Sequence, residues 1–145
     1  MFWPSFFPRI LVSSHYLILF MYILALDIGK RRTGVAFGDD QKQFVMALDT
    51  IRHTKEADLI NAIAVIIEKR QVKRLIIGLP LLPDGSQGEQ ARYVQNIATQ
   101  LQAKTSLVIE FIDERYTSFV NEAQRGADPD AASACAILSM ALERK

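Results

Sequence analysis

Cysteine and histidine are scarce in this chain of 145 residues, which has one cysteine, Cys135, and two histidines. A single cysteine excludes a disulfide within the chain and is typical of a protein from a reducing compartment, so we expect a cytoplasmic protein. Cys135 lies in an alanine-rich stretch of helical character. We expect it to fill space in the core rather than to act as a nucleophile.

A strong charge of one sign is also lacking, because 17 lysines and arginines face 16 aspartates and glutamates. The chain therefore has no global basic field that would attract nucleic acid, and any such contact must come from local clusters. One cluster is Lys30-Arg31-Arg32. A second, Lys69 to Arg74, is typical of a solvated helix end that leads into a strand.

No acidic residue occurs in residues 1–20, which contain the only tryptophan. The apolar run from Ile10 to Leu26 approaches the length of a membrane helix, about 20 residues. However, Ser and His interrupt it, and residues 23–28 are needed as a core strand. A signal peptide is disfavoured, because one arginine precedes the apolar run and no small-residue cleavage site follows. We expect residues 1–20 to be a loosely packed upstream extension, residues 21–145 to form a single domain, and no part of the protein to span a membrane.

The apolar pattern predicts an α/β fold. Three hairpin-linked strands followed by two crossover-linked strands predict a mixed five-stranded sheet flanked by helices. The helix starts are predicted at Thr54, at a capping box of Ser86 with Glu89, and at Asp128-Pro129. The predicted strands are 23–28, 33–39, 44–53, 72–78 and 107–112, and the predicted helices are 58–70, 86–103, 117–124 and 130–142.

Asp27 is the first candidate for a functional residue. It ends a buried strand, and Gly29 and the cluster Lys30-Arg31-Arg32 follow it before the next strand begins. A carboxylate at the end of a buried strand is costly unless a cation or a metal ion pairs with it.

Two further carboxylates could join Asp27. Glu114 follows the predicted strand 107–112, and Asp130 lies in the first turn of the last predicted helix. If the first and last strands run parallel, Asp27 and Glu114 project from the same edge, where open α/β sheets place their sites. Three carboxylates without a nearby histidine or cysteine favour Mg²⁺ or Mn²⁺, and two such ions can drive phosphodiester hydrolysis. Structural roles stay open for each acid, as a turn cap, a surface ion pair or a partner of the helix dipole.

Four segments in order resemble the successive motifs of the YqgF/RuvX family: LALDIGKRRTGVA, IIGLPLLPDGSQGEQA, IDERYTS and DAASACAIL. The resemblance runs from Met21 to the C-terminus. It implies an RNase H-like fold related to the Holliday-junction resolvases, and a role in maturing the 5′ end of the small-subunit ribosomal RNA precursor. It also implies that Asp27, Glu114 and Asp130 are the catalytic, metal-binding acids.

The function expected from this resemblance is that of a Mg²⁺- or Mn²⁺-dependent endonuclease acting on a ribosomal RNA precursor, as a monomer or homodimer. Lys30, Arg31 and Arg32 are expected to grip the backbone, and Arg115 and Thr117 to orient Glu114 or meet a phosphate. The alternatives are a nuclease that acts on branched DNA and a non-catalytic RNA-binding module. A phosphotransferase of the sugar-kinase or actin type also begins with strand–Asp-x-Gly–strand, but it needs a second such unit.

Two features depart from the family pattern. The segment between Arg115 and Asp130 is shorter than usual, and Arg125-Gly126-Ala127-Asp128-Pro129 replaces a more basic loop. Ser139 stands where the family usually carries glutamine. The loss of cations before Asp130 gives Lys30-Arg31-Arg32 more weight as the contact to the substrate backbone.

Three other positions have predicted roles. We expect His53, next to Arg52, to be a surface or strand-end residue. Asp113 alternates with Glu114 along the strand and is expected to serve in hydrogen bonding. Gly78 and the loop from Gly85 to Gly88 suit either a phosphate cradle or a tight crossover loop.

Overall fold

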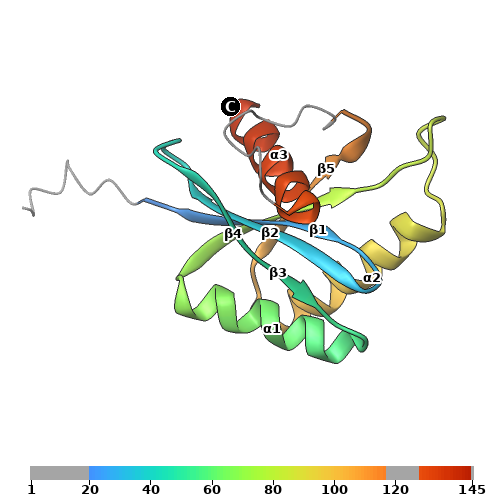
Figure 1. Ribbon diagram of the computed structural model, residues 1–145, viewed down its shortest axis with the longest axis horizontal. Helices are drawn as coiled ribbons and strands as arrows, with labels where there is room; N and C mark the ends of the chain where they lie inside the picture. The colour runs from blue at the N-terminus through green and yellow to red at the C-terminus, as the bar shows by residue number, and fades with distance from the viewer. Residues whose placement is uncertain (1–19, 117–127, 145) are drawn as a thin grey trace, which may run out of the picture.

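The computed structural model of the protein describes residues 20–116 and 128–144. A five-stranded sheet lies at its centre, with the strand order β3-β2-β1-β4-β5 (Figure 1). β1 pairs antiparallel with β2, and β2 antiparallel with β3, whereas β1, β4 and β5 run parallel. The predicted mixed sheet is therefore confirmed. The strands are β1 (Tyr22–Ile28), β2 (Arg32–Asp39), β3 (Val45–Arg52), β4 (Val72–Leu79) and β5 (Val108–Asp113).

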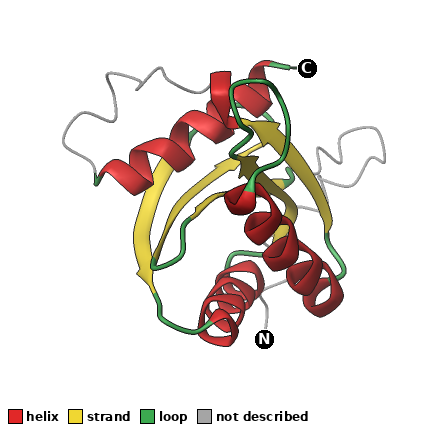
Figure 2. Ribbon diagram, turned by 90° about the vertical axis from the view of Figure 1, so that its right-hand side faces the viewer, coloured by secondary structure: helices red, strands yellow, loops and turns green. Residues whose placement is uncertain are grey.

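Helices cover both faces of the sheet. α1 (Glu56–Lys69) and α2 (Glu89–Thr105) lie together on one face, and α3 (Pro129–Glu143) lies on the other (Figures 1 and 2). A short 3₁₀ turn, η3 (Glu114–Tyr116), follows β5. The predicted helix 117–124 and nearly all of the predicted extension 1–20 lie outside the described residues. In the parts of the chain that the structure describes, no helix is both long and apolar enough to cross a membrane.

The alternation of side chains along β1 determines which face each residue supplies. Leu24, Leu26 and Ile28 join the core beneath α1 and α2, whereas Ile23 and Ala25 join the core beneath α3. Since successive side chains of a strand point to opposite faces, Asp27 belongs to the face that α3 covers. The apolar pattern thus places this carboxylate beside α3.

Two of the three predicted helix starts are wrong. α1 begins at Glu56 after Lys55, and Thr54 does not cap it. α2 begins at Glu89 after Gly88, and the predicted capping box is absent because the backbone N–H and hydroxyl of Ser86 both donate to Asp84 in a local turn. A short-range turn has therefore taken the side chain that the sequence pattern assigned to the helix.

The start of α3 is as predicted, with Asp128 before it and Pro129 in its first turn. The Asp128 carboxylate also accepts a hydrogen bond from the Thr50 hydroxyl of β3. This contact ties the first turn of α3 to the sheet.

The first turn of α3 approaches β2 very closely at Gly34. A Cβ atom on Gly34 would overlap the backbone carbonyl of Asp130. Gly34 is also the ladder partner of Asp27. The missing side chain therefore allows the backbone of Asp130 to lie over the strand beside Asp27.

We predict that Gly34→Ala lowers the free energy of unfolding by about 3 kcal/mol, because a methyl group here must displace helix backbone rather than a flexible side chain. Urea denaturation followed by circular dichroism measures this change. Gly88→Ala is the matched control, since its Cβ would lie 3.1 Å from the end of the Leu82 side chain, and we expect a loss below about 1 kcal/mol. Equal stability of Gly34→Ala and the wild type would contradict the close packing of α3.

Candidate active site

Asp27 and Glu114 meet at the edge of the sheet where the parallel strands end. β4 lies between their strands, and Leu26 pairs with Ile77 just before Gly78. A Cβ atom on Gly78 would overlap the Glu114 carboxyl and lie 2.8 Å from its Cγ. Glu114 therefore crosses β4 above a glycine, and its carboxyl forms a hydrogen bond with the carboxyl of Asp27.

This contact changes the acidity of Glu114. Burial, the hydrogen bond with Asp27 and the negative charge of Asp27 together raise the pKa of Glu114 to about 8, and the charge of Asp113 adds to the effect. Glu114 is thus mostly protonated at neutral pH. Two carboxyl groups held together in this way form a place where a cation can replace the proton.

Asp130 lies close by, but its carboxylate has a different partner. Its Oδ2 atom is 3.2 Å from Nε of Arg32. The same oxygen is buried and accepts no hydrogen bond. Across residues 20–116 and 128–144, no three Cys, His, Asp or Glu side chains are close enough to hold a metal ion together. The structure therefore brings Asp27 and Glu114 into contact. Asp130, the third predicted acid, forms an ion pair with Arg32 instead.

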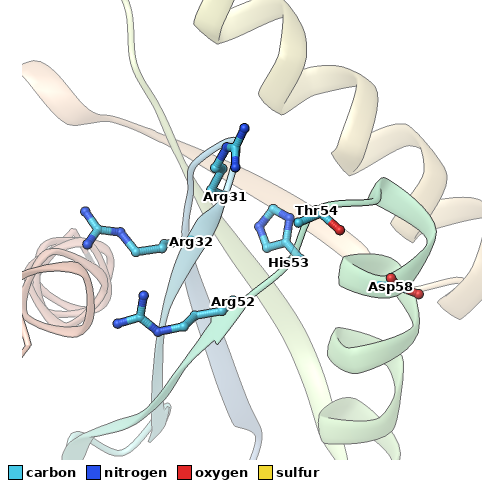
Figure 3. A pocket seen from close by; sticks show the side chains of 6 residues that line it. All are labelled: Arg31, Arg32, Arg52, His53, Thr54 and Asp58. Atoms are coloured by element: carbon cyan, nitrogen blue, oxygen red, sulfur yellow. The ribbon is translucent and has the colours of Figure 1, made fainter.

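The three predicted backbone-binding cations lie at the same edge, with different surroundings. Nζ of Lys30 lies 3.6 Å from Oε1 of Glu89, and both side chains are exposed. Arg32 pairs with Asp130. Arg31 lines a cleft of about 700 Å³, with the other lining residues shown in Figure 3: Arg32, Arg52, His53, Thr54 and Asp58.

His53 follows directly after β3, which confirms the strand-end alternative of its prediction, but its side chain does not lie at the surface. The side chain is 7% exposed, and Nε2 lies 3.1 Å from the Thr33 hydroxyl. Its backbone N–H donates to the carbonyl oxygen of Arg31. Burial lowers the pKa of His53. The Thr33 hydroxyl, contributed by the neighbouring strand, allows a polar ring to be buried here.

Arg115 makes a double hydrogen bond with Asp113, with Nη2 2.7 Å from Oδ2, and its Nη1 donates to the carbonyl oxygen of Pro83. Hydrogen bonds from Arg115 hold the pKa of Asp113 below its ordinary value. The predicted hydrogen-bonding role of Asp113 is confirmed. Arg115 thereby links the end of β5 to the loop after β4, whereas Thr117 lies outside the described residues.

A family profile described as "RuvX: Holliday junction resolvase" matches residues 21–144. The chain belongs to the RuvX family. A relative from Synechococcus elongatus, named "Putative pre-16S rRNA nuclease", is 46% identical over 99 residues, which are 68% of this chain and 66% of the relative. A relative of the same name from a Polaromonas species is 40% identical over 119 residues, 82% of this chain and 86% of the relative. The matched segment thus spans just under two thirds of the first relative.

Solved structures confirm the predicted RNase H-like fold of this RuvX chain. Thermus thermophilus RuvC in complex with a Holliday junction substrate superposes with a TM-score of 0.64 at 11% identity, covering 86% of this chain and 94% of RuvC. The fowlpox virus Holliday junction resolvase gives a TM-score of 0.55 at 9% identity, over 86% of this chain and 100% of the resolvase. At these identities the likeness concerns the fold alone.

Sequence reasoning missed Arg52 in this RuvX site. It ends β3 directly opposite Arg32 in the antiparallel ladder. The predicted strand 44–53 contained this residue, but only the register of β2 with β3 shows that it lies beside Arg32. The signal in the sequence was the adjacent pair Arg52-His53 at a strand end.

We predict that the raised pKa of Glu114 makes the folded state less stable as the pH rises. From about pH 4.5 to 8 the folded chain keeps a proton that the unfolded chain has lost, so stability falls with a slope of at most about 1.4 kcal/mol per pH unit. Glu114→Gln should remove this component of the slope. Urea titrations at several pH values measure the difference between variant and wild type.

The matched control is Glu143→Gln, which removes an exposed carboxyl from the far end of α3 and should retain the wild-type slope. If Glu114→Gln and the wild type lose stability in parallel between pH 4.5 and 8, Glu114 does not hold a proton in the folded protein.

Proposed function

We propose that this chain is a metal-dependent endonuclease that hydrolyses phosphodiester bonds, and that it acts in the cytoplasm on the 5′ end of the 16S ribosomal RNA precursor. One observation carries the proposal, namely the contact of the Asp27 and Glu114 carboxyls at the edge where the parallel strands end. The name of the relatives from Synechococcus elongatus and a Polaromonas species supports the RNA substrate.

The residues present fit a hard divalent cation. Asp27, Glu114 and Asp130 offer carboxylate oxygens, which Mg²⁺ and Mn²⁺ prefer. Asp27 and Glu114 would hold the ion after Glu114 gives up its proton. The buried Oδ2 of Asp130, which accepts no hydrogen bond, supports a third ligand that joins when the ion pair with Arg32 opens. Such an ion supplies an activated water and stabilises the charge that develops on the leaving oxygen.

The chain's own residues would then bind and orient the substrate. Opening the Arg32–Asp130 ion pair would free the Arg32 guanidinium for a phosphate oxygen, and Lys30 and Arg31 would hold the backbone by charge. Arg115 would keep the loop after β4 in place through its bond to Pro83. We assign Thr117 a substrate contact on the basis of the DERxT motif alone.

A Holliday-junction resolvase acting on branched DNA is the second candidate. The description of the family profile favours it, and so does the fold shared with a RuvC bound to a junction. The same carboxyl pair would serve both substrates, because the scissile group is a phosphodiester in each. A non-catalytic RNA-binding module is disfavoured, since such a module has no need of two partly buried carboxyls in contact.

Cleavage assays test the activity. We expect the wild type with Mg²⁺ or Mn²⁺ to trim a 16S precursor fragment that carries its 5′ leader, and Asp27→Asn to lower kcat by at least about 1000-fold. A four-way DNA junction assayed in parallel decides between the two substrates. Asp49→Asn is the control, as it removes one exposed carboxylate from β3. Cleavage by Asp27→Asn at the wild-type rate would show that the activity comes from elsewhere.

Calorimetric titration tests the metal site separately from turnover. The full chain should bind Mn²⁺, and Asp27→Asn and Glu114→Gln should each weaken binding by about tenfold or more. Arg32→Gln should strengthen it, because Asp130 is released from its ion pair. Identical titrations for all of these proteins would rule out a metal at this edge.

A further inference from the structure

The cleft beside the carboxyl pair has an unusual concentration of positive charge. Arg31 lies in the turn before β2, Arg32 begins β2, and Arg52 ends β3 (Figure 3). One carboxylate, Asp58 of α1, stands against these three arginines in the lining. Such a lining attracts an anion.

The positions of Arg32 and Arg52 are unfavourable for the fold itself. They are direct partners in the β2–β3 ladder, and Figure 3 shows their side chains extending alongside each other. Like charges placed directly opposite destabilise a sheet. Asp130 forms an ion pair with Arg32, whereas within the described residues Arg52 has only a weaker attraction to the Asp128 carboxylate, whose pKa it helps to lower. A ligand would explain why this charge is placed here.

Two of the three guanidinium groups are available. Within the described residues, the side chains of Arg31 and Arg52 make no hydrogen bond and no ion pair. Their backbone is nevertheless fixed, because the N–H of His53 donates to the carbonyl oxygen of Arg31 at 3.0 Å and the His53 ring bonds to Thr33. The two walls of the cleft are thus tied together before any ligand arrives.

The cleft lies on the same edge as the carboxyl pair. Arg52 pairs with Arg32, and Gly34, two residues further along β2, pairs with Asp27. Since neighbouring strands are about 4.8 Å apart, the end of β3 lies roughly 10 Å across the sheet from β1. A nucleic-acid strand whose scissile group sits at Asp27 can therefore pass over this cleft.

We propose that the cleft binds a phosphodiester group of the nucleic-acid backbone, next to the bond that is cleaved, and that Arg52 and Arg31 are its contacts. This inference rests on the proposed nuclease function. A guanidinium can bond to two oxygens of one phosphate. Because such contacts read neither base nor sugar, RNA and DNA of the same sequence bind here alike.

The test measures binding of a fluorescein-labelled RNA oligonucleotide, and of DNA of the same sequence, by anisotropy in EDTA. Arg52→Gln and Arg31→Gln should each weaken both by about tenfold. Each should also reduce the slope of log K against log salt by about 0.7 to 0.9. Lys69→Gln removes the same charge at the opposite end of α1 and should leave both quantities unchanged. Arg52→Gln should also raise the urea midpoint, since it removes the like-charge pair.

Wild-type affinity and salt slope in Arg52→Gln and Arg31→Gln would overturn the proposal, even if the wild type cleaves RNA. Loss of inorganic phosphate binding in these variants, with oligonucleotide binding intact, would also overturn it, because the cleft would then hold a free anion. Conversely, binding that depends on Arg52 in a wild type that cleaves neither substrate would support the cleft and refute the nuclease function.

Discussion

The close approach of α3 to β2 at Gly34 is the contact on which the rest of the site depends. It places the backbone of Asp130 over the ladder partner of Asp27. A second glycine, Gly78, allows Glu114 to cross β4 and reach Asp27. The lack of a side chain at Gly34 and at Gly78 thus allows acids from three separate segments to lie at one edge. A methyl group at Gly34 would displace Asp130, and one at Gly78 would displace Glu114.

The charges along this edge are arranged in order. The carboxyl pair of Glu114 and Asp27 lies over β1 and β4, the ion pair of Asp130 with Arg32 lies over β2, and Arg52 ends β3. Arg32 forms an ion pair with Asp130, whereas the side chain of Arg52 forms no ion pair within the described residues and is attracted more weakly to Asp128. The ion pair keeps Asp130 and Arg32 neutral together, and the arrival of a cation and a phosphate would separate them. The ion pair can thus stabilise the site without ligands, and once it opens, Asp130 would be able to contact the cation and Arg32 the phosphate.

Much of the fold and part of the site could be predicted from the sequence. The alternation of apolar residues gives the strands and places Asp27 on the face of α3, because side-chain direction in a strand is a local property. Contacts between side chains on different strands, in contrast, cannot be read from the local sequence. The burial of His53 depends on Thr33 from another strand. Arg52 became a candidate for the site only through its register with Arg32. Helix starts failed for a related reason, since Ser86 bonds to Asp84 more readily than to the helix.

We propose that Asp27 and Glu114 together hold a divalent cation. Anomalous diffraction from crystals of the full chain soaked in Mn²⁺ tests it most directly. We expect a manganese peak within bonding distance of both carboxylates, with Asp130 turned away from Arg32 toward the ion. A structure in which manganese binds elsewhere, while Asp27 and Glu114 keep their hydrogen bond and Asp130 keeps Arg32, would contradict it.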